Sequence, residues 1–161
     1  MFNFNISNMS LSKKKNRKAN AERKRLPAKT VHQFLQSASA ELKEFFYRVD
    51  NEILGIGSDV VRYTTHREIN YKTSEVFVYL AIQTRKNCLR LFIKSFNDDM
   101  IDPKSLTKPS RTMRLFFISP KDEQLGEYPI DYIMFLIHQS YDTTQLKLKH
   151  KRAIKYNGRS A

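Results

Sequence analysis

The sequence has little of what cofactor-binding and membrane proteins are built from. It contains one cysteine and four glycines in 161 residues. One cysteine excludes an internal disulfide and a cysteine-rich zinc site, and the scattered glycines form no phosphate-binding loop. No apolar run approaches the roughly 20 residues of a membrane-spanning helix, and an apolar start before a basic cluster is the reverse of a signal peptide. We expect no membrane segment, no cofactor and a cytoplasmic location.

Candidate catalytic and metal-binding groups are also sparse. The four histidines show no His-x-x-x-His or Glu-x-x-His spacing, so we expect no metal site. Asp98, Asp99 and Asp102, with Lys104, form the only dense acidic cluster that could hold Mg²⁺ in a nuclease. Because Asp102 precedes a proline, we favour a turn there. Cys88 is expected to be a packed thiol, and no catalytic residue is predicted.

Positive charge is abundant, and it is concentrated at the two ends of the chain. The net charge is +13. Residues 1–29 hold nine Lys and Arg against one Glu, residues 145–161 hold six and no acid, and residues 30–144 are nearly neutral with 14 basic and 15 acidic residues. We predict a disordered basic arm over 1–29, a single folded domain over 30–144, and a basic C-terminal tail over 145–161.

The two ends are the predicted contacts with a polyanion, because Lys and Arg neutralise phosphates. For the C-terminal end, an extension of the last helix and a flexible tail are both open, and we favour the flexible tail. The candidate residues are Lys13, Lys14, Lys15, Arg17, Lys18, Arg23, Lys24, Arg25, Lys147, Lys149, Lys151 and Arg152.

The folded domain begins with a helical pattern. Apolar residues spaced by three and four predict one amphipathic helix over 31–54. Thr30 is its expected N-cap, and Gln33 completes a capping box. Gly55 is expected to end the helix.

After this helix the apolar period changes to two, which predicts strands. The short 84–87 connection predicts a hairpin, and Pro129 is expected to open a second helix. The order is a helix, an antiparallel meander of three or four strands and a helix, which defines an α+β domain. The expected strand segments are 60–65 with 69–72, 76–83, 88–94 and 111–118.

One face of the predicted sheet combines aromatic and basic side chains. Such faces bind single-stranded RNA or DNA, because rings stack on bases while cations meet phosphates. Alternatively, a helix covers this face, so that the rings fill a second small core and the cations extend to its rim. Of the two interpretations we favour the covered face. The candidate binding residues here are Phe77, Tyr79, Arg90, Phe92, Lys94 and Arg114.

Several segments together resemble a known family. The most specific is Ile130-Asp-Tyr-Ile-Met-Phe-Leu-Ile-His-Gln-Ser-Tyr, preceded in order by segments at 42–60, 69–72, 87–94 and 102–106. Over about residues 40–142 the chain resembles the small bacterial domain of unknown function 5655. The resemblance implies a compact α+β module, found alone or at the C-terminus of larger proteins that can carry nuclease-like or DNA-associated domains. It implies no catalytic residues. The chain departs from the family at 107–112, where relatives commonly have a Gly- and aromatic-rich segment.

These features predict a non-enzymatic module that associates with nucleic acid. The folded domain would supply geometry, and the basic ends would contact phosphates of RNA or DNA. A second interpretation is a protein-interaction or structural subunit of a defence or ribonucleoprotein assembly, with an acidic protein surface as partner. A nuclease is the third.

Overall fold

The predicted sheet and its flanking helices are present in a computed structural model that describes residues 26–95, 100–110, 112–124, 126 and 130–157. The strands form one antiparallel sheet in the order β1-β2-β3-β4-β6-β5. This confirms the α+β class, with six strands instead of three or four. The elements are α2 (Val31–Leu35), α3 (Ala40–Gly55), β1 (Val61–Thr64), β2 (Ile69–Lys72), β3 (Val76–Gln83), η2 (Thr84–Lys86), β4 (Cys88–Lys94), β5 (Lys108–Ser110), β6 (Met113–Ile118), α4 (Pro120–Gln124) and α5 (Ile130–Asn157).

The first helical segment is divided in two. The predicted capping box is confirmed, because Gln33 N donates to Thr30 Oγ1 at 3.2 Å and Thr30 N donates to Gln33 Oε1 at 2.8 Å. The single helix over 31–54 is wrong, since α2 and α3 are separated by a turn. Ser39 begins α3 as a second N-cap, accepting a hydrogen bond from Leu42 N at 3.1 Å. The helix ends at Gly55, as predicted.

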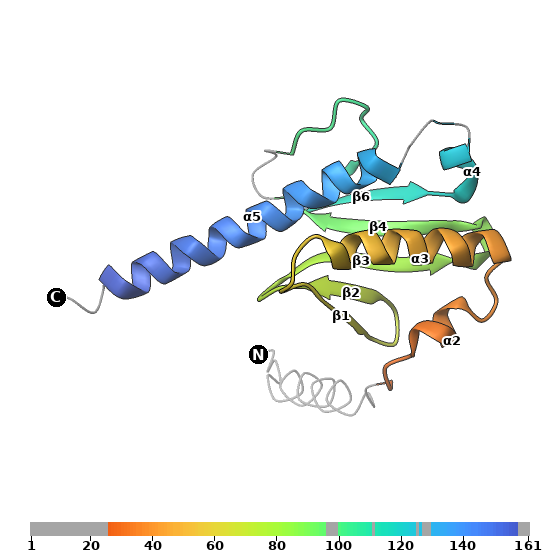
Figure 1. Cartoon of the computed structure of the whole chain (residues 1–161), viewed down its shortest axis with the longest axis horizontal. Helices are drawn as coiled ribbons and strands as arrows, with labels where there is room; N and C mark the ends of the chain where they lie inside the picture. Colours follow the sequence, from red (N-terminus) through yellow and green to blue (C-terminus); the bar gives the residue numbers. More distant parts are fainter. Residues whose placement is uncertain (1–25, 96–99, 111, 125, 127–129, 158–161) are drawn as a thin grey trace, which may run out of the picture.

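Helices α3 and α5 both lie on the same face of the sheet (Figure 1). Leu80, Leu91 and Phe116 are directly paired across β3, β4 and β6, so they point to this face together. They are buried against apolar residues of both helices, and the result is a two-layer domain. The helical side of this core includes Leu42, Phe45, Phe46, Val49, Ile53, Ile133, Leu136 and Ile137.

A buried polar network ties α3 to the first hairpin. Asp50 of α3 is 2% exposed and accepts a hydrogen bond from the Tyr71 hydroxyl at 2.7 Å. Its other oxygen forms an ion pair with Arg62 of β1. Burial raises the pKa of Tyr71, and the neighbouring Asp50 charge raises it further. Both carboxylate oxygens are therefore satisfied, as a buried charge requires.

Phe77 belongs to the core. The pairing of β2 with β3 shifts register at Tyr71, where β3 contains one extra residue. Such a bulge re-aims the side chains beside it. Phe77 is fully buried, and its ring lies 5.6 Å from the ring of Tyr141 on α5. The prediction that Phe77 lies on the same face of the sheet as Tyr79 is therefore wrong.

Strand β6 presents the opposite faces from those predicted. It pairs with β4 so that Phe116 lies opposite Leu91 and Arg114 lies opposite Ile93. Phe116 is 1% exposed, whereas Phe117 is 41% exposed. The placement of Arg114 on the aromatic face is thus wrong. A register shift of one residue exchanges the two faces of a strand, and no short turn sets the register of β6 on β4.

The C-terminal segment is helical through Asn157, and α5 projects beyond the sheet (Figure 1). The prediction of a flexible tail is therefore wrong for residues 145–157. This segment contains four Lys and two Leu, which favour helix, and Lys151 Nζ pairs with Glu75 of the β2–β3 turn at 2.6 Å. No described helix is both long enough and apolar enough to span a membrane.

Candidate functional site

The face of the sheet opposite α3 and α5 carries a row of aromatic side chains. The register places Tyr63 opposite Asn70, Asn70 opposite Tyr79, and Tyr79 opposite Phe92. Directly paired residues point to the same side of a sheet, so the row crosses four strands. Phe117 of β6 lies two residues beyond the partner of Phe92 and shares this side. Asn70 itself is buried, at 2% exposed, and we call the surface formed by Tyr63, Tyr79, Phe92 and Phe117 the open face.

Rings on the open face are accessible. Tyr63 is 38% exposed and Phe117 is 41% exposed, while Tyr79 and Phe92 are half-buried. Both α3 and α5 pack on the other side of the sheet. Neither α3 nor α5 therefore covers the aromatic face, so the covered face that we favoured is not formed by these helices.

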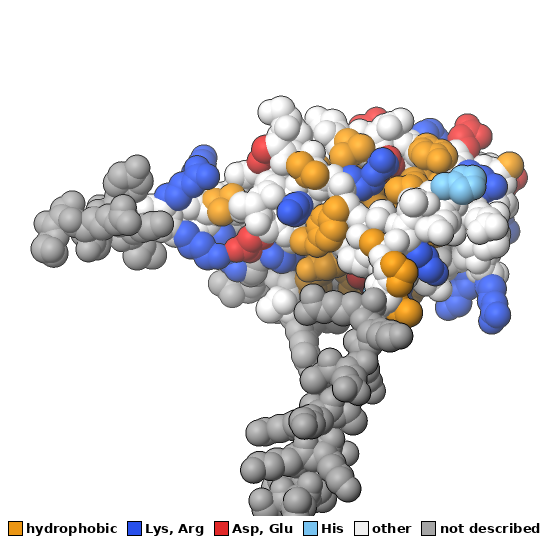
Figure 2. Space-filling view, turned by 90° about the horizontal axis from the view of Figure 1, so that it is seen from below, with side chains coloured by type: hydrophobic (Ala, Val, Ile, Leu, Met, Phe, Trp, Pro, Cys, Tyr) orange, Lys and Arg blue, Asp and Glu red, His pale blue; other side chains and the backbone are white. Residues whose placement is uncertain are grey.

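Cations lie against three of these rings, which is a favourable electrostatic contact with the ring face. Arg90 also forms an ion pair with Glu68 at 3.8 Å. Figure 2, seen from below Figure 1 and so towards the β1 edge of the sheet, shows hydrophobic side chains interspersed with Lys and Arg side chains on that side of the molecule. The pairs, measured to the ring centroid, are Arg90 with Phe92 at 5.2 Å, Lys72 with Tyr63 at 5.3 Å and Lys86 with Phe117 at 5.7 Å.

Three lysines gather at the end of the sheet where β3 begins. Glu75 accepts hydrogen bonds from Lys151 Nζ at 2.6 Å and Lys94 Nζ at 3.1 Å. The bond from Lys151, followed by that from Lys94, lowers the pKa of Glu75 to about 2. Burial lowers the pKa of Lys147, and the nearby Lys94 and Lys151 charges act in the same direction. We call Lys94, Lys147 and Lys151 the lysine cluster. It carries more positive charge than Glu75 neutralises.

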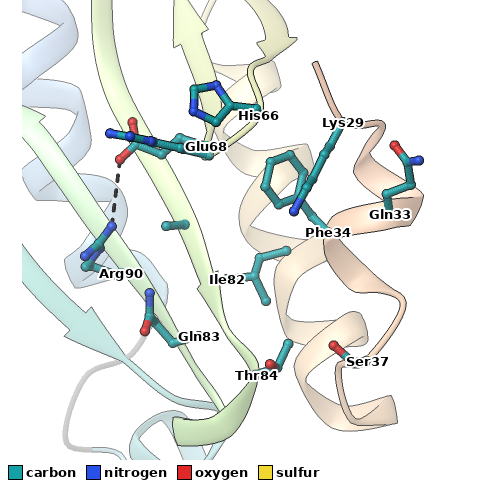
Figure 3. Close-up of a pocket in the computed structure, with 12 residues that line it drawn as sticks. Lys29, Gln33, Phe34, Ser37, His66, Glu68, Ile82, Gln83, Thr84 and Arg90 are labelled. Carbon is teal, nitrogen blue, oxygen red and sulfur yellow. Dashed lines mark ion pairs between the residues drawn. The ribbon is translucent and has the colours of Figure 1, made fainter. Parts of the chain in front are cut away.

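A cavity of about 480 Å³ lies at the opposite end of β3, beside α2 (Figure 3). Arg90 lines this cavity, and its guanidinium also lies against the Phe92 ring of the open face. The cavity is therefore continuous with the aromatic row. It is lined by Lys29, Gln33, Phe34, Ser37, His66, Arg67, Glu68, Ala81, Ile82, Gln83, Thr84 and Arg90.

The predicted residues of the two ends are placed differently by the structure. The N-terminal candidates, Lys13, Lys14, Lys15, Arg17, Lys18, Arg23, Lys24 and Arg25, lie outside the described residues. The C-terminal candidates all lie on α5. Lys149 and Arg152 are exposed, whereas Lys147 and Lys151 join Lys94 of the sheet around Glu75. Residues predicted as two separate sets thus meet at one end of the open face.

Four residues here were not predicted from the sequence: the rings Tyr63 and Phe117 of the open face, and Lys72 and Lys86, which lie against them. The β1–β2 hairpin was an available signal, because its turn sets the pairing that brings Tyr63 into line with Tyr79. Phe117 could not be found in this way, since its face depends on the long-range pairing of β6.

The groups weighed for catalysis have structural roles where they are described. The Asp102 carboxylate accepts hydrogen bonds from Leu106 N, from Thr107 N and Oγ1, and from the Tyr132 hydroxyl. Burial raises the pKa of Asp102, but these bonds outweigh it and lower the pKa overall. Asp102 thus closes its own loop. Cys88 is buried, and burial raises the pKa of its thiol, as for a packed side chain.

Asp98 and Asp99 of the predicted acidic cluster lie outside the described residues, as does Pro129, which is expected to open the second helix. The remaining geometry defines a class: a two-layer α+β domain whose antiparallel sheet has helices on one side and a row of aromatic and basic side chains on the other. Residues 31–144 match the family described as domain of unknown function (DUF5655), and the chain belongs to this family. No curated protein and no solved structure matches it significantly.

Proposed function

We propose that this chain binds single-stranded nucleic acid, RNA or DNA, on the open face of its sheet, as a binding module and not as an enzyme. The observation that carries the proposal is the row Tyr63, Tyr79 and Phe92, which lies opposite the helices and has cations against its rings. Rings presented in this way stack on bases, and each stacked base contributes about 1–3 kcal/mol.

Positive charge on either side of the row, at the two ends of β3, complements a phosphate backbone. The lysine cluster lies where β3 begins, and Arg90 and Lys86 lie near where it ends. Residues 1–29 add a net charge of +8 to the chain. If six cations contact phosphates, the logarithm of the affinity should fall with the logarithm of the salt concentration with a slope of about −4.

The dimensions of the row set the length of strand that it can hold. The row crosses β1, β2, β3 and β4, and neighbouring strands lie about 4.8 Å apart, so the rings from Tyr63 to Phe92 span about 14 Å. A nucleic acid lying across these strands would place about three bases on the three rings, close to the lower end of the site sizes of single-strand binding folds.

The test compares rings on the two sides of the molecule. We expect Phe92→Leu, in the full chain, to weaken binding of a labelled 12-nucleotide single strand by about 5- to 150-fold without changing the salt slope, because stacking releases no counterions. Tyr63→Leu should act in the same direction, and its 38% exposed ring carries little of the core. The control is Phe135→Leu, since Phe135 is 43% exposed on α5.

Fluorescence anisotropy titrations at several salt concentrations measure these affinities, and thermal melting checks that each variant is folded. Equal affinities for the wild type, Tyr63→Leu and Phe135→Leu would refute stacking on the open face. If the wild type binds polyglutamate but no single strand, the open face serves an acidic protein partner instead, which is the alternative function.

A further inference from the structure

The cavity beside α2 has the charge and the lining of a nucleotide site. Three of its residues, Lys29, Arg67 and Arg90, carry a formal positive charge, and Glu68 is its one carboxylate. The surplus is therefore two positive charges, before any contribution from His66. An internal phosphodiester carries one negative charge, whereas a terminal phosphate monoester carries about −1.5 to −2 at pH 7. The surplus matches the terminal group.

An aromatic ring stands beside one of these cations. Lys29 Nζ lies 5.7 Å from the centroid of the Phe34 ring. Figure 3 shows Lys29 and Phe34 on the side of α2, the Glu68–Arg90 pair on the opposite side, and Ile82 between them. A ring and an aliphatic side chain next to a cation suit the base and the phosphate of a single nucleotide. The volume of about 480 Å³ falls within the range of small-molecule sites.

Arg90 connects this cavity to the aromatic row. Its guanidinium lies 5.2 Å from the Phe92 ring centroid and 3.8 Å from Glu68. Its Nε atom is buried and has no hydrogen-bond partner among the described residues. This unsatisfied donor lies where the cavity meets the aromatic row, and a small movement of the Arg90 side chain would allow it to donate to a phosphate oxygen.

We propose that the cavity holds the terminal nucleotide of a strand bound to the open face, with its terminal phosphate monoester at Lys29 and Arg67 and its base against Phe34 and Ile82. This inference rests on the proposed function, because the strand must first lie on the aromatic row. The chain would then bind strand ends in preference to internal sequence.

The test uses the full chain and three six-nucleotide single strands of one sequence, which carry a 5′-phosphate, a 3′-phosphate or hydroxyl groups at both ends. We expect one phosphorylated strand to bind at least tenfold more tightly than the hydroxyl-ended strand. In a Lys29→Ala, Arg67→Ala double variant this preference should fall below twofold. Both side chains are exposed, so the fold should not depend on them.

The matched control is a Lys104→Ala, Lys121→Ala double variant, which removes the same charge from exposed positions outside the cavity. It should keep the preference for the phosphorylated end. Two results overturn the proposal while leaving the open face in place: equal binding of all three strands, and a preference that survives in the Lys29→Ala, Arg67→Ala variant.

A mononucleotide probe distinguishes binding of a strand end from binding of a free nucleotide, because both ligands carry a base and a terminal phosphate. We expect the mononucleoside monophosphate to bind at least tenfold more weakly than the phosphorylated strand, because it lacks contacts with the aromatic row. Equal affinity would assign the cavity to free nucleotides and overturn the strand-end proposal. Failure of every strand to bind would instead count against the proposed function itself.

Discussion

Replacing Asp50 by Ala tests how the helical layer is held to the first hairpin. The substitution leaves the Tyr71 hydroxyl without its acceptor, in a side chain that is fully buried. A buried hydrogen-bond donor that is left without an acceptor costs about 1–3 kcal/mol. Loss of the ion pair with Arg62 adds at most about 1 kcal/mol, because the Arg62 side chain is 33% exposed and can be rehydrated. We expect the free energy of unfolding to fall by about 1–4 kcal/mol.

A double-mutant cycle measures the cost of leaving the Tyr71 hydroxyl without its acceptor. Tyr71→Phe alone removes the donor and leaves Asp50 paired with Arg62, at a cost of about 1 kcal/mol. In the Asp50→Ala, Tyr71→Phe variant no buried donor is left without an acceptor. The loss in free energy of unfolding should therefore be smaller than the sum of the two single losses by about 1–2 kcal/mol. Urea denaturation followed by circular dichroism measures all four proteins. Additive losses, or an Asp50→Ala loss below about 0.5 kcal/mol, would show that the network does not stabilise the fold as argued.

Two further predictions concern charge. The pKa of Glu75 is lowered from 4.5 to about 2 in the folded chain, so the stabilising effect of its charge is complete above pH 4.5 and is lost as the pH falls towards 2. The variant Glu75→Gln should therefore show a smaller drop in melting temperature between pH 4.5 and pH 2 than the wild type. An equal drop in the two proteins would contradict this. Residues 1–25 carry eight Lys and Arg and one Glu, so deleting them should reduce the affinity for single-stranded nucleic acid at least tenfold near 0.1 M salt. Fluorescence anisotropy measures this affinity. An unchanged affinity would assign binding to the folded domain alone.

Features set by neighbouring residues could be predicted from the sequence. The capping box of Thr30 with Gln33 and the hairpin at 84–87 involve groups only a few positions apart, and both are present. The break before Ser39 is also local, but the apolar spacing of Leu35, Ala38 and Leu42 continues through it and so concealed the second N-cap.

Features set by distant pairing could not be predicted in this way. The bulge that turns Phe77 into the core arises where β2 pairs with β3, and the exposed position of Phe117 follows from the register of β6 on β4. The lysine cluster needs α5 to continue past residue 145 and reach Glu75. The aromatic row could therefore be predicted only in part, through Tyr79 and Phe92.

Placing both helices on one side of the sheet separates two evolutionary pressures. Leu80 and Leu91 point to the helices and are constrained by packing, whereas the alternating residues Tyr79 and Phe92 point away from them. Substitutions at the second set change the outward surface of the sheet at little cost to the packing of the first. Members of such a family can diverge in ligand while they retain the same interior, so a ligand found for one member transfers to another only where the residues of this outward set agree.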